Sequence, residues 1–333
     1  MHQMTSLEYS FLVNELAPRI VGKHFGRIRK LAESVYRMKI GTIEIICQLG
    51  VRMHETRYIE KTEETDHFAE KAAKELDNAK LLSLEQLNSD RIIAFNFDCG
   101  TLVFEMFGDG NAVLVRGSNT VCAVHYGKWS DREITAGAPY SPPKNVPSTK
   151  LELSQKYVIV SLTKLPLGKD YALEALSRAG IDEKKPGISL SEVESRRLES
   201  EISKIRELAS PFTFYDQSGK PVDFALAPLT KHRGLETRNF KTLSEAADEY
   251  YQNAERPNPK LEKLLGRLEK QKERLIELSE EEKEAKAKGD YIYANYQEVD
   301  RILTLAKAGK FEEIEKLYNG KIDKKGKSVE AEF

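Results

Sequence analysis

Residues 92–115 read IIAFNFDCGTLVFEMFGDGNAVLV, which is three apolar runs separated by two short turns. The runs cover 92–97, 102–107 and 112–115, and the turns contain Gly100 and the triplet 108–110. Short apolar runs bounded by glycine and aspartate are typical of neighbouring strands that are joined by tight turns. This stretch therefore predicts an antiparallel meander.

The residues before the meander predict a second sheet and two helices. Apolar runs at 35–40 and 43–49, separated by Gly41, indicate strands within a strand-like region from 27 to 57. Residues 5–8 read Thr-Ser-Leu-Glu, a capping-box pattern, and apolar residues at helical spacing follow them. We expect a helix there and another over 67–78.

After the meander the chain predicts a boundary and a smaller unit. Residues 137–143 read GAPYSPP, which breaks every periodic pattern and is typical of a linker. Helices are expected around 171–178 and over 190–209, and a hairpin is expected from 213–215 to 222–224.

The composition changes again after Pro257. Between residues 260 and 290 there are 9 basic and 9 acidic residues, and leucines at 261, 264, 268, 275 and 278 occupy five of six core heptad positions. This spacing predicts one arm of a coiled coil. We expect Gly289 to interrupt the helix, which resumes over 291–308, and we expect the chain to be part of a longer protein that supplies the arm's partner.

These elements together predict an α+β fold with three domains, at 1–145, 146–256 and 257–333. The formal net charge is −1, so the overall charge neither favours nor excludes a nucleic-acid partner. No apolar run approaches the ~18 residues of a membrane span, and Glu8, Glu15 and Arg19 lie where a signal peptide would be apolar. We therefore expect no membrane association and a cytoplasmic location.

Motifs for catalysis or metal binding are missing from the sequence. It contains no Walker A loop, no G-x-G-x-x-G, no H-E-x-x-H and no G-x-S-x-G. The three cysteines, at 47, 99 and 122, are far apart, and the six histidines have no evident companions. We predict no disulfide, no metal site, no cofactor and no catalytic residue.

Basic residues cluster once along the chain. Between Arg19 and Lys39 there are seven basic residues and one acid, Glu33. Such a cluster suits a phosphate backbone, although a strand edge that lysine and arginine protect from aggregation would look the same. The candidate RNA-backbone residues are Lys23, Arg27, Arg29, Lys30 and Arg52.

One further segment is a candidate for binding from its residues alone and has a plain structural alternative, whereas the residues around Asp90, Arg91 and Glu8 do not by themselves indicate a site. The loop at 165–172, which contains Gly168 and Lys169, leads into a helix as phosphate-binding loops do, but an ordinary corner between two helices has the same pattern. Asp90 and Arg91 precede a strand, where a turn is the plain interpretation. Glu8 has the plain role of a helix cap.

Taken together, the chain resembles the NFACT family of ribosome quality-control factors, which includes bacterial RqcH and the nuclear export mediator factor. The segments that carry the resemblance occur in family order and are 5–8, 51–54, 89–93, 110–114, 137–143, 243–251 and 289–296. The resemblance implies an NFACT-N domain shaped like a formamidopyrimidine-DNA glycosylase at 1–145, a helix-hairpin-helix domain with a small hairpin at 146–256, and part of a coiled coil at 257–333.

The resemblance also implies the function. Family members bind large ribosomal subunits that still hold peptidyl-tRNA and recruit tRNA, which is alanyl-tRNA in bacterial members. They support untemplated C-terminal extension of the stalled chain, in which the ribosome makes the peptide bonds. We therefore expect a non-catalytic factor, with a possible partner protein at the coiled coil.

The family's tRNA-binding residues map onto Asp90, Arg91 and Glu8 of this chain. Arg91 is suited to a bidentate contact with a phosphate or a guanine edge, and Asp90 is suited to orient Arg91 or to accept from a base amine. Two alternatives remain open: a nucleic-acid-binding protein related to DNA repair, and a surface protein that binds fibronectin. Base excision is not expected, because the chain starts Met-His-Gln-Met and lacks the N-terminal proline that the glycosylases use.

Overall fold

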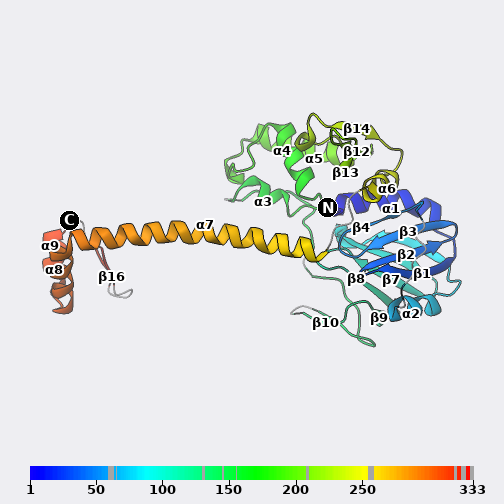
Figure 1. Ribbon diagram of the computed structural model, residues 1–333, viewed down its shortest axis with the longest axis horizontal. Coiled ribbons are helices and arrows are strands. Elements are labelled where there is room, and N and C mark those ends of the chain that lie inside the picture. Colours follow the sequence, from blue (N-terminus) through cyan, green and yellow to red (C-terminus); the bar gives the residue numbers. More distant parts are fainter. Residues whose placement is uncertain are drawn as a thin grey trace. The chain divides into compact units, whose positions relative to one another are not determined.

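The computed structural model describes residues 1–58, 64, 66–129, 132–144, 146–154, 156–207, 210–253, 259–318, 321–323 and 328–330. The chain forms two compact units, Met1–Glu255 and Arg256–Phe333, and each is described by itself (Figure 1). The α+β class with antiparallel sheets is confirmed.

Two antiparallel sheets form the larger part of the first unit. The four-stranded sheet has the order β1-β2-β3-β4, with strands at Phe25–Ala32, Val35–Ile40, Ile43–Gln48 and Arg52–Glu55. The five-stranded sheet has the order β5-β6-β7-β8-β9, with strands at Leu81–Gln86, Ile92–Phe97, Gly100–Glu105, Asn111–Arg116 and Asn119–Ala123. The meander is confirmed as β6 to β8, and the sequence patterns had missed β5.

The inner faces of the two sheets share one hydrophobic core. Side chains alternate along each strand, so Met38 and Ile45 of the first sheet and Phe95 and Phe104 of the second point into this core. Cys47 Sγ of β3 lies 3.8 Å from Met106 Sδ, at the end of β7. The cysteines are reduced, as expected.

A close crossing of two turns also connects the sheets. A Cβ atom on Gly110 would lie 2.2 Å from the backbone nitrogen of Gly50, and both glycines have positive φ angles of 72° and 74°. The turn between β3 and β4 therefore touches the turn between β7 and β8 at a distance that only glycine permits.

Two helices accompany the sheets (Figure 1): α1 at Ser6–Ile20 and α2 at His67–Glu75. The capping box is confirmed, because the Thr5 side chain accepts from Glu8 N while the Glu8 side chain accepts from Thr5 N. Leu12, Leu16 and Ile20 of α1 are fully buried. Helix α1 is therefore positioned both by its cap and by its apolar face.

The remainder of the first unit combines helices with a small sheet. The helices are α3 at Val158–Leu162, α4 at Lys169–Ala179, α5 at Glu192–Glu207 and α6 at Leu243–Asn253. The sheet has the order β13-β12-β14, with strands at Pro221–Ala225, Phe212–Tyr215 and Glu236–Asn239. The predicted helices and hairpin are confirmed, residues 208 and 209 lie outside the described residues, and β14 had not been predicted.

The segment that suggested a linker is bonded to the five-stranded sheet. Thr120 N donates to Ala138 O at 2.8 Å, and Tyr140 Oη donates to Glu105 at 2.9 Å. The short hairpin β10 at Gly127–Lys128 and β11 at Glu133–Ile134 precedes it. Residues on both sides of 145 belong to the same compact unit, and the domain boundary at that position stays a prediction.

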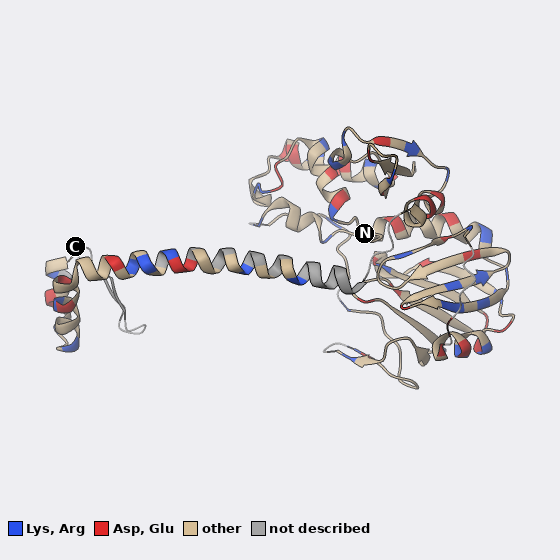
Figure 2. Ribbon diagram, viewed as in Figure 1, with Lys and Arg blue, Asp and Glu red and all other residues tan. Residues whose placement is uncertain are grey.

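The second unit consists of helices α7 at Pro259–Ala294, α8 at Tyr296–Lys307 and α9 at Phe311–Tyr318, with short strands β15 at Lys321–Asp323 and β16 at Ser328–Glu330. The prediction that Gly289 interrupts the helix is wrong, because α7 continues through it and ends before Asn295. One glycine inside a helix costs only about 1 kcal/mol, which a long helix tolerates. Basic and acidic residues are interspersed along α7 (Figure 2).

The predicted coiled coil stays a prediction. Leu268, Leu275 and Leu278 of α7 are exposed, while the side chains of Leu261 and Leu264 lie outside the described residues. Within the part of the chain that the structure describes, no helix is long and apolar enough to span a membrane.

A buried ion pair provides the first testable prediction. Arg132 donates to both carboxylate oxygens of Glu105, and the two side chains are only 6% and 3% exposed. Glu105→Ala would leave the guanidinium buried without its carboxylate, so we expect the free energy of unfolding to fall by about 3 kcal/mol in urea titrations. The control is Glu133→Ala, whose exposed pair with Lys128 should contribute less than about 1 kcal/mol. Equal losses in both variants would contradict the prediction.

Candidate functional site

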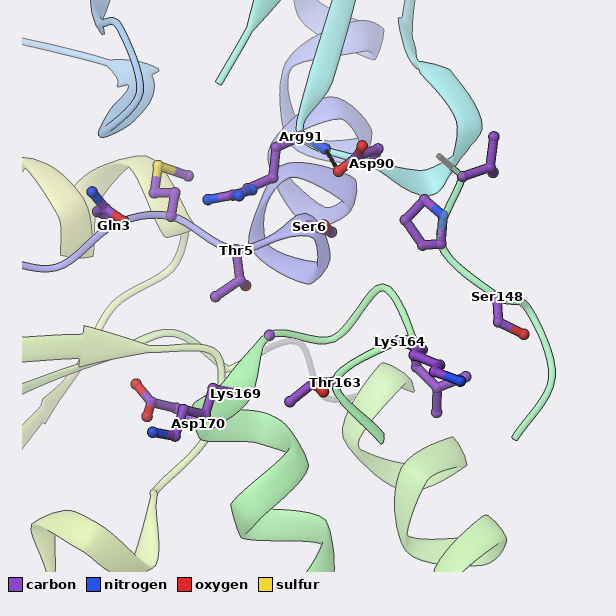
Figure 3. Close-up of a pocket in the computed structure, with 15 residues that line it drawn as sticks. Gln3, Thr5, Ser6, Asp90, Arg91, Ser148, Thr163, Lys164, Lys169 and Asp170 are labelled. Carbon is purple, nitrogen blue, oxygen red and sulfur yellow. Dashed lines mark hydrogen bonds between the residues drawn. The ribbon is translucent and has the colours of Figure 1, made fainter. Parts of the chain in front are cut away.

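An open pocket of about 980 Å³ lies where the start of α1, the turn before β6 and the loop before α4 meet (Figure 3). Its lining comes from 3–6, 90–91 and 146–148 and from residues within 163–170. Asp90 and Arg91 thus line the same pocket as Gly168 and Lys169. The structure brings together two candidates that the sequence had suggested separately.

The turn that carries Asp90 and Arg91 has an unusual backbone. Asn88 and Ser89 have positive φ angles of 55° and 53°, a region that residues other than glycine rarely adopt. The Gln86 side chain donates to both Ser6 O and Asp90 O at 2.8 Å. This amide therefore fixes the turn against the start of α1.

Asp90 and Arg91 use their side chains differently. Asp90 Oδ1 accepts from the backbone nitrogen of Arg91 at 2.7 Å, so this carboxylate shapes the turn. Figure 3 shows the Arg91 side chain directed toward Gln3 and Thr5. Among the described residues, its guanidinium makes no hydrogen bond or ion pair and is available to a ligand.

Gly168 allows the loop before α4 to touch the start of α1. Its φ is +94°, and a Cβ atom there would lie 2.4 Å from Thr5 Cγ2. The glycine is therefore needed for a close contact with the N-cap of α1. In this loop, the residue that is suited to contact a phosphate is the exposed Lys169, the first residue of α4.

The charges on the pocket lining favour an anionic ligand. Arg91, Lys164 and Lys169 are its cations, and the side chains of both lysines are also without ion pairs in the described part of the chain. The two acids are Asp90 and Asp170. Asp170 is already paired, because its Oδ2 lies 2.7 Å from Lys231 Nζ. The balance suits a phosphate better than a cation.

Glu8 does not line this pocket. Its side chain is fully buried, and its carboxylate accepts from Thr5 N at 2.7 Å and from Tyr171 Oη at 2.8 Å. A direct contact between Glu8 and tRNA stays a prediction that this geometry does not support. The structure places Glu8 behind the pocket wall, where it holds residues 3–6.

A buried charged network centred on His2 was missed by the sequence reasoning. His2 Nε2 lies 3.1 Å from Glu8 Oε2, and His2 Nδ1 lies 2.6 Å from Asp223 Oδ1. The other Asp223 oxygen lies 2.7 Å from both Lys231 Nζ and His232 Nε2. Because 221 residues separate His2 from Asp223, no local pattern could have indicated the pair.

The network changes the acidity of its members. Burial alone would lower the pKa of His2, but Glu8 and Asp223 together outweigh burial and raise it to about 10. Burial would raise the pKa of Asp223, yet hydrogen bonds from His2, Lys231 and His232 lower it. His2 is therefore an imidazolium at neutral pH, with one carboxylate on each side.

His54 has the opposite character. It is fully buried, and burial together with the nearby Arg52 lowers its pKa to about 3. The His54 ring stacks on the Tyr251 ring of α6, with 5.6 Å between the ring centres. The Arg52 guanidinium lies 4.2 Å from the centre of the Tyr251 ring. Arg52 is therefore engaged in the contact between β4 and α6.

The other four candidate RNA-backbone residues lie at different places. Arg27 and Arg29 alternate with the core residue Ile28, so their side chains lie on the outer face of the four-stranded sheet. Lys30 points to the opposite side, 3.4 Å from Glu64. Lys23 is exposed before β1. The five residues do not form one continuous cluster.

The outer face has two basic residues that the candidate set had left out. Lys39 lies opposite Arg27 and Arg37 lies opposite Arg29 in the strand pairing. Glu44 Oε1 is 3.4 Å from Arg27 and 3.9 Å from Lys39, and Glu44 Oε2 is 3.6 Å from Arg37. One carboxylate is thus surrounded by three cations, which leaves this face basic.

No cluster of three or more histidine, cysteine, aspartate or glutamate side chains that could hold a metal ion is found within the described ranges. The expectations of no metal and no cofactor stay predictions. The arrangement offers cations and hydrogen-bond donors for binding an anion.

Comparison with known proteins shows the family to which this chain belongs. The model of the family "NFACT N-terminal and middle domains" matches residues 8–315. The archaeal Rqc2 homolog aRqcH of Methanocaldococcus jannaschii is 29% identical over 355 residues, which cover 90% of this chain and 51% of that protein. The ribosome quality control complex subunit 2 of Schizosaccharomyces pombe is 24% identical over 161 residues, covering 43% of this chain and 16% of that protein.

A solved structure shares the fold of most of this chain. The N-terminal part of the fibronectin/fibrinogen-binding protein from Streptococcus suis aligns with a TM-score of 0.59 and 19% identity, covering 75% of this chain and 99% of that one. At this identity the match concerns the fold alone. The chain spans about half the length of the archaeal relative.

The His2 network predicts a pH-dependent contribution to stability. The folded pKa of about 10 exceeds the ordinary value of 6.5, so the stabilisation is complete below pH 6.5 and is lost as the pH rises toward 10. We expect His2→Gln to lower the free energy of unfolding at pH 6 and the gap from wild type to shrink by pH 10. The exposed His125, changed to Gln, is the control. A gap that does not change with pH would refute the charged pair.

The contact between Gly168 and Thr5 is testable with two alanine variants. Gly168→Ala would add both a strained φ and a clash, whereas Gly180→Ala at the other end of α4 has a φ of +69° and no atom within 4 Å of the added Cβ. We expect Gly180→Ala to cost about 1 kcal/mol and Gly168→Ala to cost at least twice as much in urea titrations. Similar costs would show that the close contact is not needed.

Proposed function

The chain belongs to the family with NFACT N-terminal and middle domains, and from this premise we propose that it is a non-catalytic ribosome quality-control factor. It binds large ribosomal subunits obstructed by peptidyl-tRNA and recruits tRNA for untemplated C-terminal tailing of the stalled chain, in the cytoplasm. The names of the archaeal and yeast relatives support the process, and the pocket supports the tRNA contact.

The observation that carries the proposal is the Arg91 guanidinium in the pocket. It is held on a turn fixed by Gln86, and the described residues provide it with no anionic partner. Lys164 and Lys169 line the same pocket, so an RNA phosphate would meet three cations there. Asp90 is the neighbouring acceptor for a base amine.

The role is one of binding. The pocket holds no histidine or cysteine, and its described polar groups are suited to recognise phosphate and base edges. Peptide bonds in tailing are made by the ribosome in this proposal, so the chain needs no nucleophile. A partner protein at α7 and α8 remains part of the proposal, supported by the exposed leucines and tyrosines of those helices.

The decisive experiment compares two double variants, each of which changes an Asp-Arg dipeptide to Ala-Ala at a different place in the chain. Asp90→Ala/Arg91→Ala removes the pocket pair, and Asp300→Ala/Arg301→Ala removes an exposed Asp-Arg pair in α8 of the second unit. We expect the pocket variant to weaken tRNA binding at least about tenfold, because hydrogen bonds to charged groups contribute about 1.5–3 kcal/mol. The α8 variant should bind as wild type does.

The measurement is filter binding of tRNA from about 50 to 200 mM salt, with large subunits, damaged duplex DNA and fibronectin as further ligands. Loss of one phosphate contact should reduce the slope of log K against log salt by about 0.7–0.9. Equal binding by both variants would remove the pocket from the proposal. Tight binding to fibronectin or damaged DNA without tRNA binding would favour the alternative functions.

A further inference from the structure

Asp170 is the acid of the pocket that forms an ion pair with a residue outside the pocket. It lies in the first turn of α4 beside Lys169 and lines the pocket. Lys231, in the short helix Thr230–His232, does not line the pocket, yet its ammonium lies 2.7 Å from Asp170 Oδ2 and 2.7 Å from Asp223 Oδ2. One cation thus joins two carboxylates.

The position of Lys231 is fixed from the interior. Asp223 is only 9% exposed and is itself held by His2 at 2.6 Å and by His232 at 2.7 Å. His2 in turn contacts the buried Glu8 at 3.1 Å. The chain of charges therefore runs from Glu8 inside the fold to Asp170 at the pocket.

The neighbouring carboxylates keep the Lys231 side chain positively charged. Burial would lower its pKa, but the carboxylates of Asp170 and Asp223 raise it. The titratable groups around the ammonium are Asp170, Asp223 and, through Asp223, His2 and His232. Lys231 is therefore a cation throughout the neutral range.

Asp170 without this partner would oppose the ligand. The pocket has three cations, Arg91, Lys164 and Lys169, and the Asp90 carboxylate already accepts from its own turn. A free carboxylate next to Lys169 would compete with an RNA phosphate for the Lys169 ammonium. It would also repel the phosphate.

We propose that Lys231 is a positioning residue that neutralises Asp170, so that RNA phosphate can approach Lys164 and Lys169. This inference rests on the proposed tRNA binding. Lys231 acts through Asp170, and its effect on RNA affinity disappears when Asp170 has no charge.

The test is a double-mutant cycle on tRNA binding. Lys231→Met should weaken binding about fivefold at 100 mM salt, since one unscreened charge at about 4 Å contributes roughly that factor in water. Asp170→Asn should bind as tightly as wild type or more tightly, and Lys231→Met/Asp170→Asn should return to within about twofold of Asp170→Asn. Lys241→Met, which removes an exposed lysine outside the pocket, controls for net charge.

Thermal unfolding of each variant separates stability from affinity. If Lys231→Met does not fold, Lys231→Arg and Asp170→Asn carry the test: the arginine variant should bind within about twofold of wild type, and the asparagine variant should not lose affinity. Wild-type affinity in Lys231→Met, or a loss that persists in the double variant, would overturn the inference. A wild-type chain that does not bind tRNA would instead remove the proposed function and this role with it.

Discussion

The first unit depends on the buried carboxylate of Glu8. A carboxylate that is removed from water must be paired and hydrogen-bonded, because the cost of burying it alone is several kcal/mol. Glu8 is satisfied by the Thr5 backbone, the His2 ring and the Tyr171 hydroxyl. Tyr171 Oη also accepts from Leu226 N at 2.9 Å. The N-terminal segment, α4 and the end of β13 are therefore arranged around one anion.

This arrangement explains how the pocket keeps its shape. One wall, at 3–6, is held by Glu8 and by the Gly168 contact, and the opposite wall starts at Lys169 of the helix that carries Tyr171. The resemblance to the family assigned Glu8 to tRNA binding, and the structure gives it a way to affect binding without touching RNA. Loss of its carboxylate would remove the hydrogen bond to Thr5 N that helps to hold residues 3–6, which line the pocket.

The parts of the fold that local patterns encode could be predicted from the sequence. The meander and the capping box depend on residues within a few positions of one another, so spacing indicated them. β5 and β14 were missed because β5 carries exposed and polar positions and β14, with Glu236 and Arg238, is exposed throughout. The prediction of a helix break at Gly289 was wrong because the helix propensity of one residue is a weak constraint inside a helix of 36 residues.

The site shows the same limit in its electrostatics. Gly168 and Lys169 were found because they belong to a short loop pattern, and Asp90 and Arg91 were found only through the family resemblance. His2 and Lys231 act through partners that lie far away in the sequence. A chain with almost no net charge can still form a basic pocket when its acidic side chains are paired with cations or hydrogen-bond donors. Glu8, Asp170 and Asp223 are each paired with a cation or a buried donor, whereas Arg91, Lys164 and Lys169 line the pocket. The proposed preference for an anionic ligand therefore rests on which charges the fold pairs, a property that composition does not contain.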